Sequence, residues 1–167
     1  MRNLLFGLLA ALVLGSGAAF AQAGAWAGLS GGYPGATLHF GVESIVFDNL
    51  DVRLNLGYAY AGAEGFAFGV DALYGLDDLD TGELPVDVYV GGGFGLVAGE
   101  AFAVKALVGG EYRFVDLGVP ELGAFLEVGP SLGFDLNDDD LDDQNEEIYD
   151  GGFGFDARIG VNYHFDF

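Results

Sequence analysis

The sequence predicts an all-β fold, an eight-stranded antiparallel up-and-down transmembrane β-barrel. Three observations lead to this prediction. Segments about ten residues long alternate apolar with polar or glycine residues, turn-forming residues separate these segments, and no segment has helical periodicity. The 167 residues suit one domain, and they include 30 glycines and 15 phenylalanines. We therefore expect residues 24–167 to form a single barrel domain.

The chain begins with a segment typical of a cleaved secretory signal peptide. Arg2 precedes an apolar run from Leu4 to Leu14, and Ala-x-Ala triplets that signal peptidase accepts end at Ala21 and Ala23. We expect residues 1–23 to be removed, or only the first 21 if the earlier triplet is used. The alternative is an uncleaved anchor, although an apolar run of eleven residues is short for a helix across a bilayer.

Period-two alternation marks the strands. In LDVRLNLGYAY, residues 50–60, the apolar and aromatic residues share one parity, and Asp51, Arg53 and Asn55 share the other. The same rule holds in residues 36–44, 66–76, 86–96, 102–114, 122–136 and 153–167. An eighth strand is expected at 25–33; without it the count would be seven, and the orientation of every loop would be open.

Turn chemistry separates these strands. Turn residues are expected at 34–35, 47–49, 61–65, 77–83, 99–100, 118–121 and in the acidic run 137–152.

Alternation alone does not say which face of such a barrel meets water, because soluble barrels and membrane barrels both have period two. The polar parity is mostly glycine, with Gly57, Gly69, Gly75, Gly91, Gly93, Gly95, Gly109, Gly123, Gly129, Gly133 and Gly160. A face exposed to water would be rich in Lys and Glu, whereas an eight-stranded barrel has room inside for only a few long side chains. The glycine-rich face is therefore assigned to the lumen and the apolar face to lipid.

All four basic residues that follow Arg2 lie on this lumen face, together with many carboxylates. Pairing makes a buried charge tolerable, since an unpaired one would cost several kcal/mol. We expect a charge network that plugs the lumen, made of Glu43, Asp51, Arg53, Asp71, Asp87, Lys105, Glu111, Arg113, Glu127, Asp156 and Arg158.

Aromatic residues gather at the strand ends. One group comprises Tyr58, Tyr60, Phe66, Phe68, Phe94, Phe102, Phe134, Phe153 and Phe155, and the other comprises Tyr74, Tyr112, Phe114, Tyr163, Phe165 and Phe167. Two aromatic girdles that flank an aliphatic band are typical of a barrel in a bilayer. A soluble core would scatter these residues along the strands.

The C-terminal RIGVNYHFDF carries a family resemblance. Gly160, Tyr163, Phe165 and the terminal Phe167 form the terminal-strand pattern of bacterial outer-membrane barrels. With the signal peptide and the strand series, the chain resembles small outer-membrane β-barrels of the OmpA/OmpX type along essentially its whole mature length. The resemblance implies export across the inner membrane, recognition of the last strand by the barrel-assembly machinery, and contact with outer-membrane lipid.

Two features depart from that family. Three of the four loops assigned to the outer side are very short, and the inward connection 77–85 is long. We also expect a monomer.

Charge and composition exclude some functions. Only five basic residues stand against 26 acidic ones, and this net charge of −21 argues against nucleic acid as a partner. The absence of cysteine excludes disulfides, cysteine zinc sites and thiol catalysis.

Candidate catalytic residues are few, and we assign none. His39 and His164 lie on the lumen face, as does Ser131. A lipid-modifying barrel enzyme would need a histidine, a hydroxyl nucleophile and a carboxylate that converge near one rim. Glu43 shares a strand face with His39, but no serine is placed to meet them, so structural roles in the charge network are preferred.

The acidic run DLNDDDLDDQNEEIYD, residues 135–150, is the candidate metal site. Asp135, Asn137, Asp139, Asp143 and Glu146 match ligand positions of an EF-hand calcium loop, with Leu141 supplying a carbonyl. Asp140 stands where that loop has glycine, and strands flank the run instead of helices. The alternatives are a weak Ca²⁺ site and a solvated loop whose charges repel one another.

The lumen also has apolar residues. Leu73, Tyr89, Leu107 and Phe125 are expected to point inward, where they fill space or line a site for a small apolar ligand. The sequence thus favours a non-enzymatic barrel with a structural or surface-interaction role in the cell envelope and no required cofactor. The alternatives are a lipid-modifying enzyme and a binding module for a small apolar ligand or Ca²⁺.

Overall fold

The structure is a computed structural model, and it describes residues 24–44, 48–76, 79, 85–136 and 152–165. Its strands are β1 (Ala25–Tyr33), β2 (Gly35–Val42), β3 (Leu50–Ala59), β4 (Gly65–Gly75), β5 (Val86–Val97), β6 (Ala101–Phe114), β7 (Val119–Asp135) and β8 (Phe153–Phe165). A 3₁₀ turn, η1 (Val115–Leu117), joins β6 to β7. No helix in the described part of the chain is long and apolar enough to cross a membrane.

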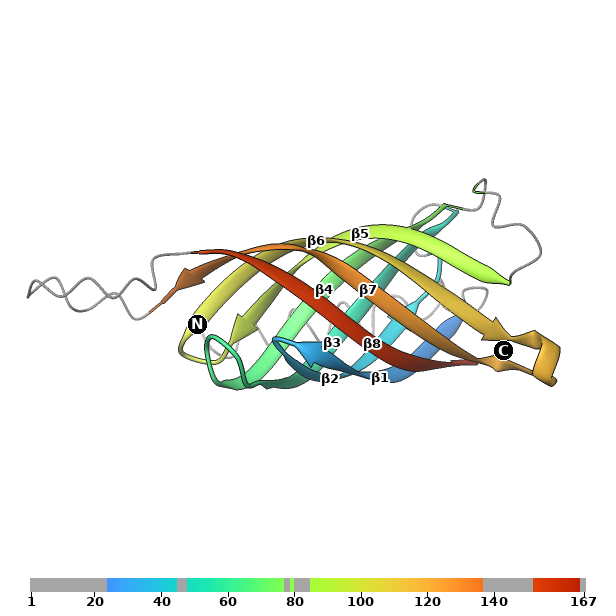
Figure 1. The fold of residues 1–167 in the computed structure, drawn as a ribbon, viewed down its shortest axis with the longest axis horizontal. Coiled ribbons are helices and arrows are strands. Elements are labelled where there is room, and N and C mark those ends of the chain that lie inside the picture. The colour runs from blue at the N-terminus through green and yellow to red at the C-terminus, as the bar shows by residue number, and fades with distance from the viewer. Residues whose placement is uncertain (1–23, 45–47, 77–78, 80–84, 137–151, 166–167) are drawn as a thin grey trace, which may run out of the picture.

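The strands form a closed barrel in chain order, β1 to β8, with every neighbouring pair antiparallel. β1 closes the barrel by pairing with β8 from Ala25↔Phe165 to Tyr33↔Ala157. The predicted eight-stranded up-and-down barrel is therefore confirmed, including its eighth strand at 25–33. Figure 1 shows the strands crossing obliquely to the long axis, with the β6–β7 hairpin extending furthest at the end where the chain terminates.

The two ends of the barrel differ in their connections. We call the end with the β1–β2, β3–β4, β5–β6 and β7–β8 connections the outer end, and the opposite one the inner end. The β5–β6 turn is tight because Gly99 adopts a φ of 79°, a left-handed conformation that suits glycine. At the outer end, the backbone N–H groups of Tyr60 and Ala61 donate to the Pro34 carbonyl, which ties the β3–β4 connection to the β1–β2 turn.

One turn lies outside its expected position. The sequence predicted turn residues at 118–121, but the turn comprises η1 and Gly118, and β7 already begins at Val119. A register shift between Arg113 and Phe114 pairs Phe114 with Val119. Pro120, which has no N–H to donate, is tolerated because β8 begins to pair with β7 only at Leu122.

The outer surface is apolar. Leu29, Leu38, Leu56, Leu126 and Ile159 are each more than half exposed and form part of an aliphatic belt. Aromatic pairs flank the belt. Tyr58 with Phe66 lies towards the outer end, and Tyr163 with Phe165 lies towards the inner end, with ring centroids 6.0 and 5.2 Å apart. Polar and charged residues are buried on the other face, so the arrangement is that of a transmembrane barrel.

Candidate functional site

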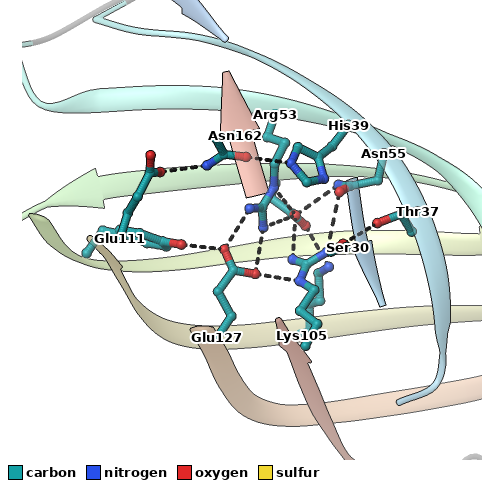
Figure 2. A network of polar contacts seen from close by, with 12 residues as sticks. Ser30, Thr37, His39, Arg53, Asn55, Lys105, Glu111, Glu127 and Asn162 are labelled. Carbon is teal, nitrogen blue, oxygen red and sulfur yellow. Dashed lines mark hydrogen bonds and ion pairs between the residues drawn. The ribbon is translucent and has the colours of Figure 1, made fainter. Parts of the chain in front are cut away.

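Arg53 lies at the centre of the lumen. It projects inward from β3 beside Asp71, its register partner on β4, and reaches across to Glu127 on β7 (Figure 2). The guanidinium lies 2.8 Å from Asp71 and 2.6 Å from Glu127. The three side chains are 1%, 0% and 2% exposed, so this bridge crosses the lumen without contact with solvent.

Two more cations join the same carboxylates. Lys105 of β6 lies 2.9 Å from Asp71, and Arg158 of β8 lies 3.1 Å from it. Arg158 also pairs with Glu127 through its Nε. Asn55 donates to Asp71 at 2.9 Å and accepts from Arg158 at 3.3 Å. The central cluster, as we call Arg53, Asn55, Asp71, Lys105, Glu127 and Arg158, draws side chains from β3, β4, β6, β7 and β8.

This pairing makes the buried charges tolerable. Taking a charged group out of water costs several kcal/mol unless partners and hydrogen bonds compensate for it. Each cation of the central cluster contacts at least one buried carboxylate, and each carboxylate contacts several donors. Removing either carboxylate would therefore leave cations uncompensated in a medium of low dielectric constant.

Glycines make room for these side chains. A methyl group on Gly93 would lie 2.2 Å from Asp71 Oδ1, and one on Gly109 would lie 2.6 Å from the Tyr89 ring. On Gly123 the same group would lie 1.9 Å from Glu111 Oε1. A side chain at any of these positions would force the charged or aromatic side chain over it to shift.

A second polar chain leads to the inner end. His39 Nε2 lies 2.7 Å from Asn162 Oδ1, and Asn162 Nδ2 donates to Glu111 at 2.6 Å. His164 continues the chain, because its Nε2 lies 2.7 Å from Glu111 Oε1 and its Nδ1 lies 3.1 Å from Glu43 Oε1. Because the Asn162 oxygen can only accept, His39 carries its proton on Nε2. The hydrogen bond from His164 holds the pKa of Glu43, which lies just beyond β2, below its usual value.

Apolar groups pack around both chains. Trp26, Leu73 and Leu107 form a buried cluster against which Tyr89 packs, and the Tyr89 hydroxyl donates to Glu127 at 2.8 Å. Trp26 also lies 5.8 Å from the Arg53 guanidinium, a cation–π geometry. Phe125, 2% exposed, meets the His39 ring edge-on at 5.4 Å. The structure places all four apolar residues predicted to point inward in the barrel interior.

The part of the chain that the structure describes encloses a cavity in the outer half of the lumen. A cavity of about 590 Å³ extends from the barrel mouth down to Lys105, Asp156 and Arg158. Asp156 accepts a hydrogen bond of 3.3 Å from Ser131. Small residues such as Gly95 and Ala103 line much of the wall. Among the described residues, side chains thus fill the inner part of the lumen and leave a cavity in the outer part.

The remaining predicted members of the charge network lie near the inner end. Arg113 lies 3.7 Å from Glu111. Asp51 is half-buried and accepts a hydrogen bond from the Ser44 backbone at 3.0 Å. Asp87 is exposed beside Glu111, its register partner. These three residues belong to the rim of the barrel and not to the central cluster.

The groups considered for catalysis lie apart. Glu43 shares a strand face with His39 but hydrogen-bonds to His164, and His39 bonds to Asn162. Ser131 bonds to Asp156 in the outer half. Among the described contacts, no serine, histidine and carboxylate converge as a hydrolytic triad would require.

Two predicted sites fall partly outside the described residues. Of the calcium-loop residues only Asp135 is described; Asn137, Asp139, Asp143 and Glu146 lie outside. Within the described ranges, no three His, Asp or Glu side chains are grouped to hold a metal ion. In the terminal-strand pattern, Tyr163 and Phe165 face outward, Gly160 lies beneath the Phe125 ring, and Phe167 lies outside the described residues.

Sequence reasoning missed Asn162 as a member of the network, and it assigned no polar contact to Asn55 or Tyr89, although it placed both in the lumen. These three side chains contribute hydrogen bonds to buried carboxylates. His164, for which the sequence favours a structural role in the network, bonds to Glu111 and Glu43. A search restricted to formal charges passed over amides and hydroxyls, which can satisfy carboxylates equally well.

Comparison with known proteins gives two solved structures. No family model matches the chain, and no curated protein matches it. The N-terminal β-barrel domain of Pseudomonas aeruginosa OprF aligns with a TM-score of 0.44 at 15% identity, covering 86% of this chain and 96% of that one. Neisserial surface protein A (NspA) aligns with a TM-score of 0.45 at 14% identity, covering 84% and 93%. The chain is thus similar to both structures over most of its length.

Proposed function

We propose that this protein is a non-enzymatic barrel of the bacterial outer membrane with a structural or surface-interaction role in the cell envelope. The apolar belt between aromatic girdles supports a membrane location, because only closed barrels and helices satisfy their backbone in hydrocarbon. The proposal includes export directed by the signal peptide 1–23 and insertion by the barrel-assembly machinery. Outer-membrane lipid is then the partner of the belt, and the barrel is a monomer.

One observation carries the functional part of the proposal. Arg53, Asp71 and Glu127 span the lumen with exposures of 2% or less, and the Trp26 cluster packs beside them. A continuous water path would hydrate these charges. The central cluster therefore plugs the lumen, and the barrel conducts no steady ion current.

Electrical recording in planar lipid bilayers tests the plug. Purified barrel is added at neutral pH and 1 M KCl, with a larger porin as positive control and boiled protein as negative control. We expect no stable conductance steps from the unheated protein. Regular, long-lived steps that the boiled sample lacks would contradict a plugged lumen.

A separate measurement tests the barrel and its location. Protein extracted from the outer-membrane fraction is run on SDS gels unheated and boiled. A heat-dependent change in mobility is expected, because a closed barrel resists detergent until it is heated. Recovery of the protein in the soluble periplasm without a mobility shift would contradict the membrane assignment.

A further inference from the structure

The lumen glycines differ in what lies over them. Some, such as Gly93 and Gly123, lie under charged side chains, and others, such as Gly57 and Gly129, lie against backbone carbonyls. Gly95 and Gly133 are different. Among the described residues, a methyl group on Gly95 would meet only the Phe68 carbonyl at 3.9 Å, and one on Gly133 only the Gly152 carbonyl at 4.0 Å. Neither glycine has a left-handed φ. Packing and backbone therefore permit side chains at both positions, and their absence keeps space open.

That space has the dimensions of a ligand site. Its volume of about 590 Å³ lies within the range of small-molecule pockets. Ala101 and Ala103 continue the small-residue wall between the two glycines, and the cavity opens at the outer end. The glycine and alanine wall offers apolar contact, and polar groups line the cavity both at the floor and near the mouth.

The charges around the cavity favour a cation. Lys105 and Arg158 reach the floor, where Lys105 pairs with Asp71 and Arg158 pairs with Asp71 and Glu127. The Asp156 carboxylate lines the cavity together with these two cations. Its described hydrogen bond is the 3.3 Å contact from Ser131. Nearer the mouth, the cavity is lined by two more carboxylates, those of Glu100 and Asp135.

We propose that the outer half of the lumen binds a small organic cation, a protonated amine with a compact apolar body. The ammonium group is held at Asp156 and Ser131, and the apolar body packs against the glycine and alanine wall. The negative mouth attracts the cation, and the central cluster ends the site below. This inference rests on the proposed barrel but not on the absence of conductance.

Three probes with the same apolar body and different head charges test the site. Benzylammonium, benzyl alcohol and benzoate are titrated into the detergent-solubilised barrel at neutral pH. Binding is followed by NMR shifts of the Gly95 and Gly133 amides. We expect benzylammonium to bind about tenfold more tightly than either of the other probes, as an ion pair in a partly buried site implies. Asp156→Asn should remove this preference.

A matched pair of variants locates the binding. Ala103→Leu places a larger side chain in the cavity, whereas Ala106→Leu makes the same change on the exposed outer face of the same strand. The first should abolish the shifts, and the second should leave them unchanged. Both variants should still show heat-dependent gel mobility, which separates loss of the site from loss of the barrel.

Several results would overturn the inference. Equal affinity for the three probes would indicate a purely apolar pocket, and preference for benzoate would assign the floor to Lys105 and Arg158. Shifts that survive Ala103→Leu would place the probe elsewhere, for example in the detergent. Absence of shifts at millimolar benzylammonium in a protein that passes the gel test would remove the site and leave the proposed barrel standing.

Discussion

Arg53 illustrates how the barrel accommodates an ion in its interior. Its Nε and Nη2 donate to Asp71 Oδ2, and its Nη1 and Nη2 donate to the two oxygens of Glu127. The planar guanidinium can make a bidentate pair with Glu127 and two further hydrogen bonds to one oxygen of Asp71 at the same time. A lysine could not reproduce this arrangement. Asp71 is a neighbour in register, and Glu127 lies 74 residues further along the chain. Closure of the barrel brings these groups together.

Removing the Glu127 charge should destabilise the barrel strongly. Glu127→Gln keeps the shape of the side chain but leaves the Arg53 and Arg158 charges undercompensated, at a cost of about 3 kcal/mol in the free energy of unfolding. Urea unfolding in lipid vesicles, followed by gel mobility, measures this change. Glu121→Gln is the matched control on the same strand, outside the described ion pairs, and should change stability by less than about 0.5 kcal/mol. Equal effects of the two variants would mean that the central cluster contributes no specific stability.

The Glu43 carboxylate should make the inner end sensitive to acid. Its pKa is held below the usual 4.5 by the hydrogen bond from His164, so the folded state binds its proton less readily than the unfolded state. The stabilisation is therefore fully present above pH 4.5 and is lost as the pH falls through the lower, folded-state value. Glu43→Gln should be less stable than the wild type at pH 7, and the difference should shrink as the pH falls below 4.5. Unfolding curves at several pH values measure it, and a difference that does not vary with pH would contradict the assignment.

Residue parity does not predict which lumen side chains hydrogen-bond to one another. Parity placed Glu43 and His39 on one face, but four residues along a strand span about 13 Å, too far for a hydrogen bond. His164 of β8 is the nearer group, since the lumen brings together residues from opposite and neighbouring strands. Parity therefore predicts which side chains enter the lumen, whereas partners depend on register and closure.

At the scale of elements, alternation predicted the strands well because lipid and lumen impose opposite requirements on successive residues. The expected strand at 50–60 differs from β3 by a single residue at its end. The start of β7 was predicted less well. The bulge at Arg113 and Phe114 lengthens the β6–β7 hairpin, and such a bulge changes the register without leaving a mark in the alternation.

A charged residue introduced on the outer surface should destabilise the barrel by an amount that depends on its depth in the bilayer. Leu126 lies in the middle of β7 and is 58% exposed on the outer face, whereas Leu117 in η1 is 72% exposed at the tip of the inner hairpin. Leu126→Arg should cost about 3 kcal/mol in vesicles, and Leu117→Arg less than about 1 kcal/mol, because the penalty falls towards the interface. Unfolding measurements in vesicles compare the two variants. Equal, small costs would indicate that water and not lipid covers the outer face.

At the scale of the whole molecule, the lumen is divided into a filled inner part and a hollow outer part. The sequence predicted a narrow, glycine-rich interior with a charge network, but it could not predict this division. Gly93 and Gly95 are the same residue type two positions apart, yet Asp71 covers Gly93, whereas no described side chain lies over Gly95. Which glycine is covered depends on the length of the side chains opposite and on the shear of the barrel.

Net charge is the other property of the whole molecule, and it leads to the last prediction. Of the 26 acidic residues, nine lie in the run 135–150 at the outer connection between β7 and β8. Carboxylates at this density attract Ca²⁺ either through defined ligands or through screening alone. If the ligands are defined, 1 mM Ca²⁺ should slow cleavage after Glu146 and Glu147 by a glutamate-specific protease, and a chelator should reverse the effect.

Two double variants with equal charge distinguish these modes. Asp139→Asn with Asp143→Asn removes predicted ligands, whereas Asp138→Asn with Asp142→Asn removes the same charge from positions that the calcium-loop pattern does not use. A defined site should lose its protection in the first variant and keep it in the second. Equal loss in both would show that the run acts only as a diffuse negative field, and protection that persists in both would place the bound ion elsewhere on the barrel.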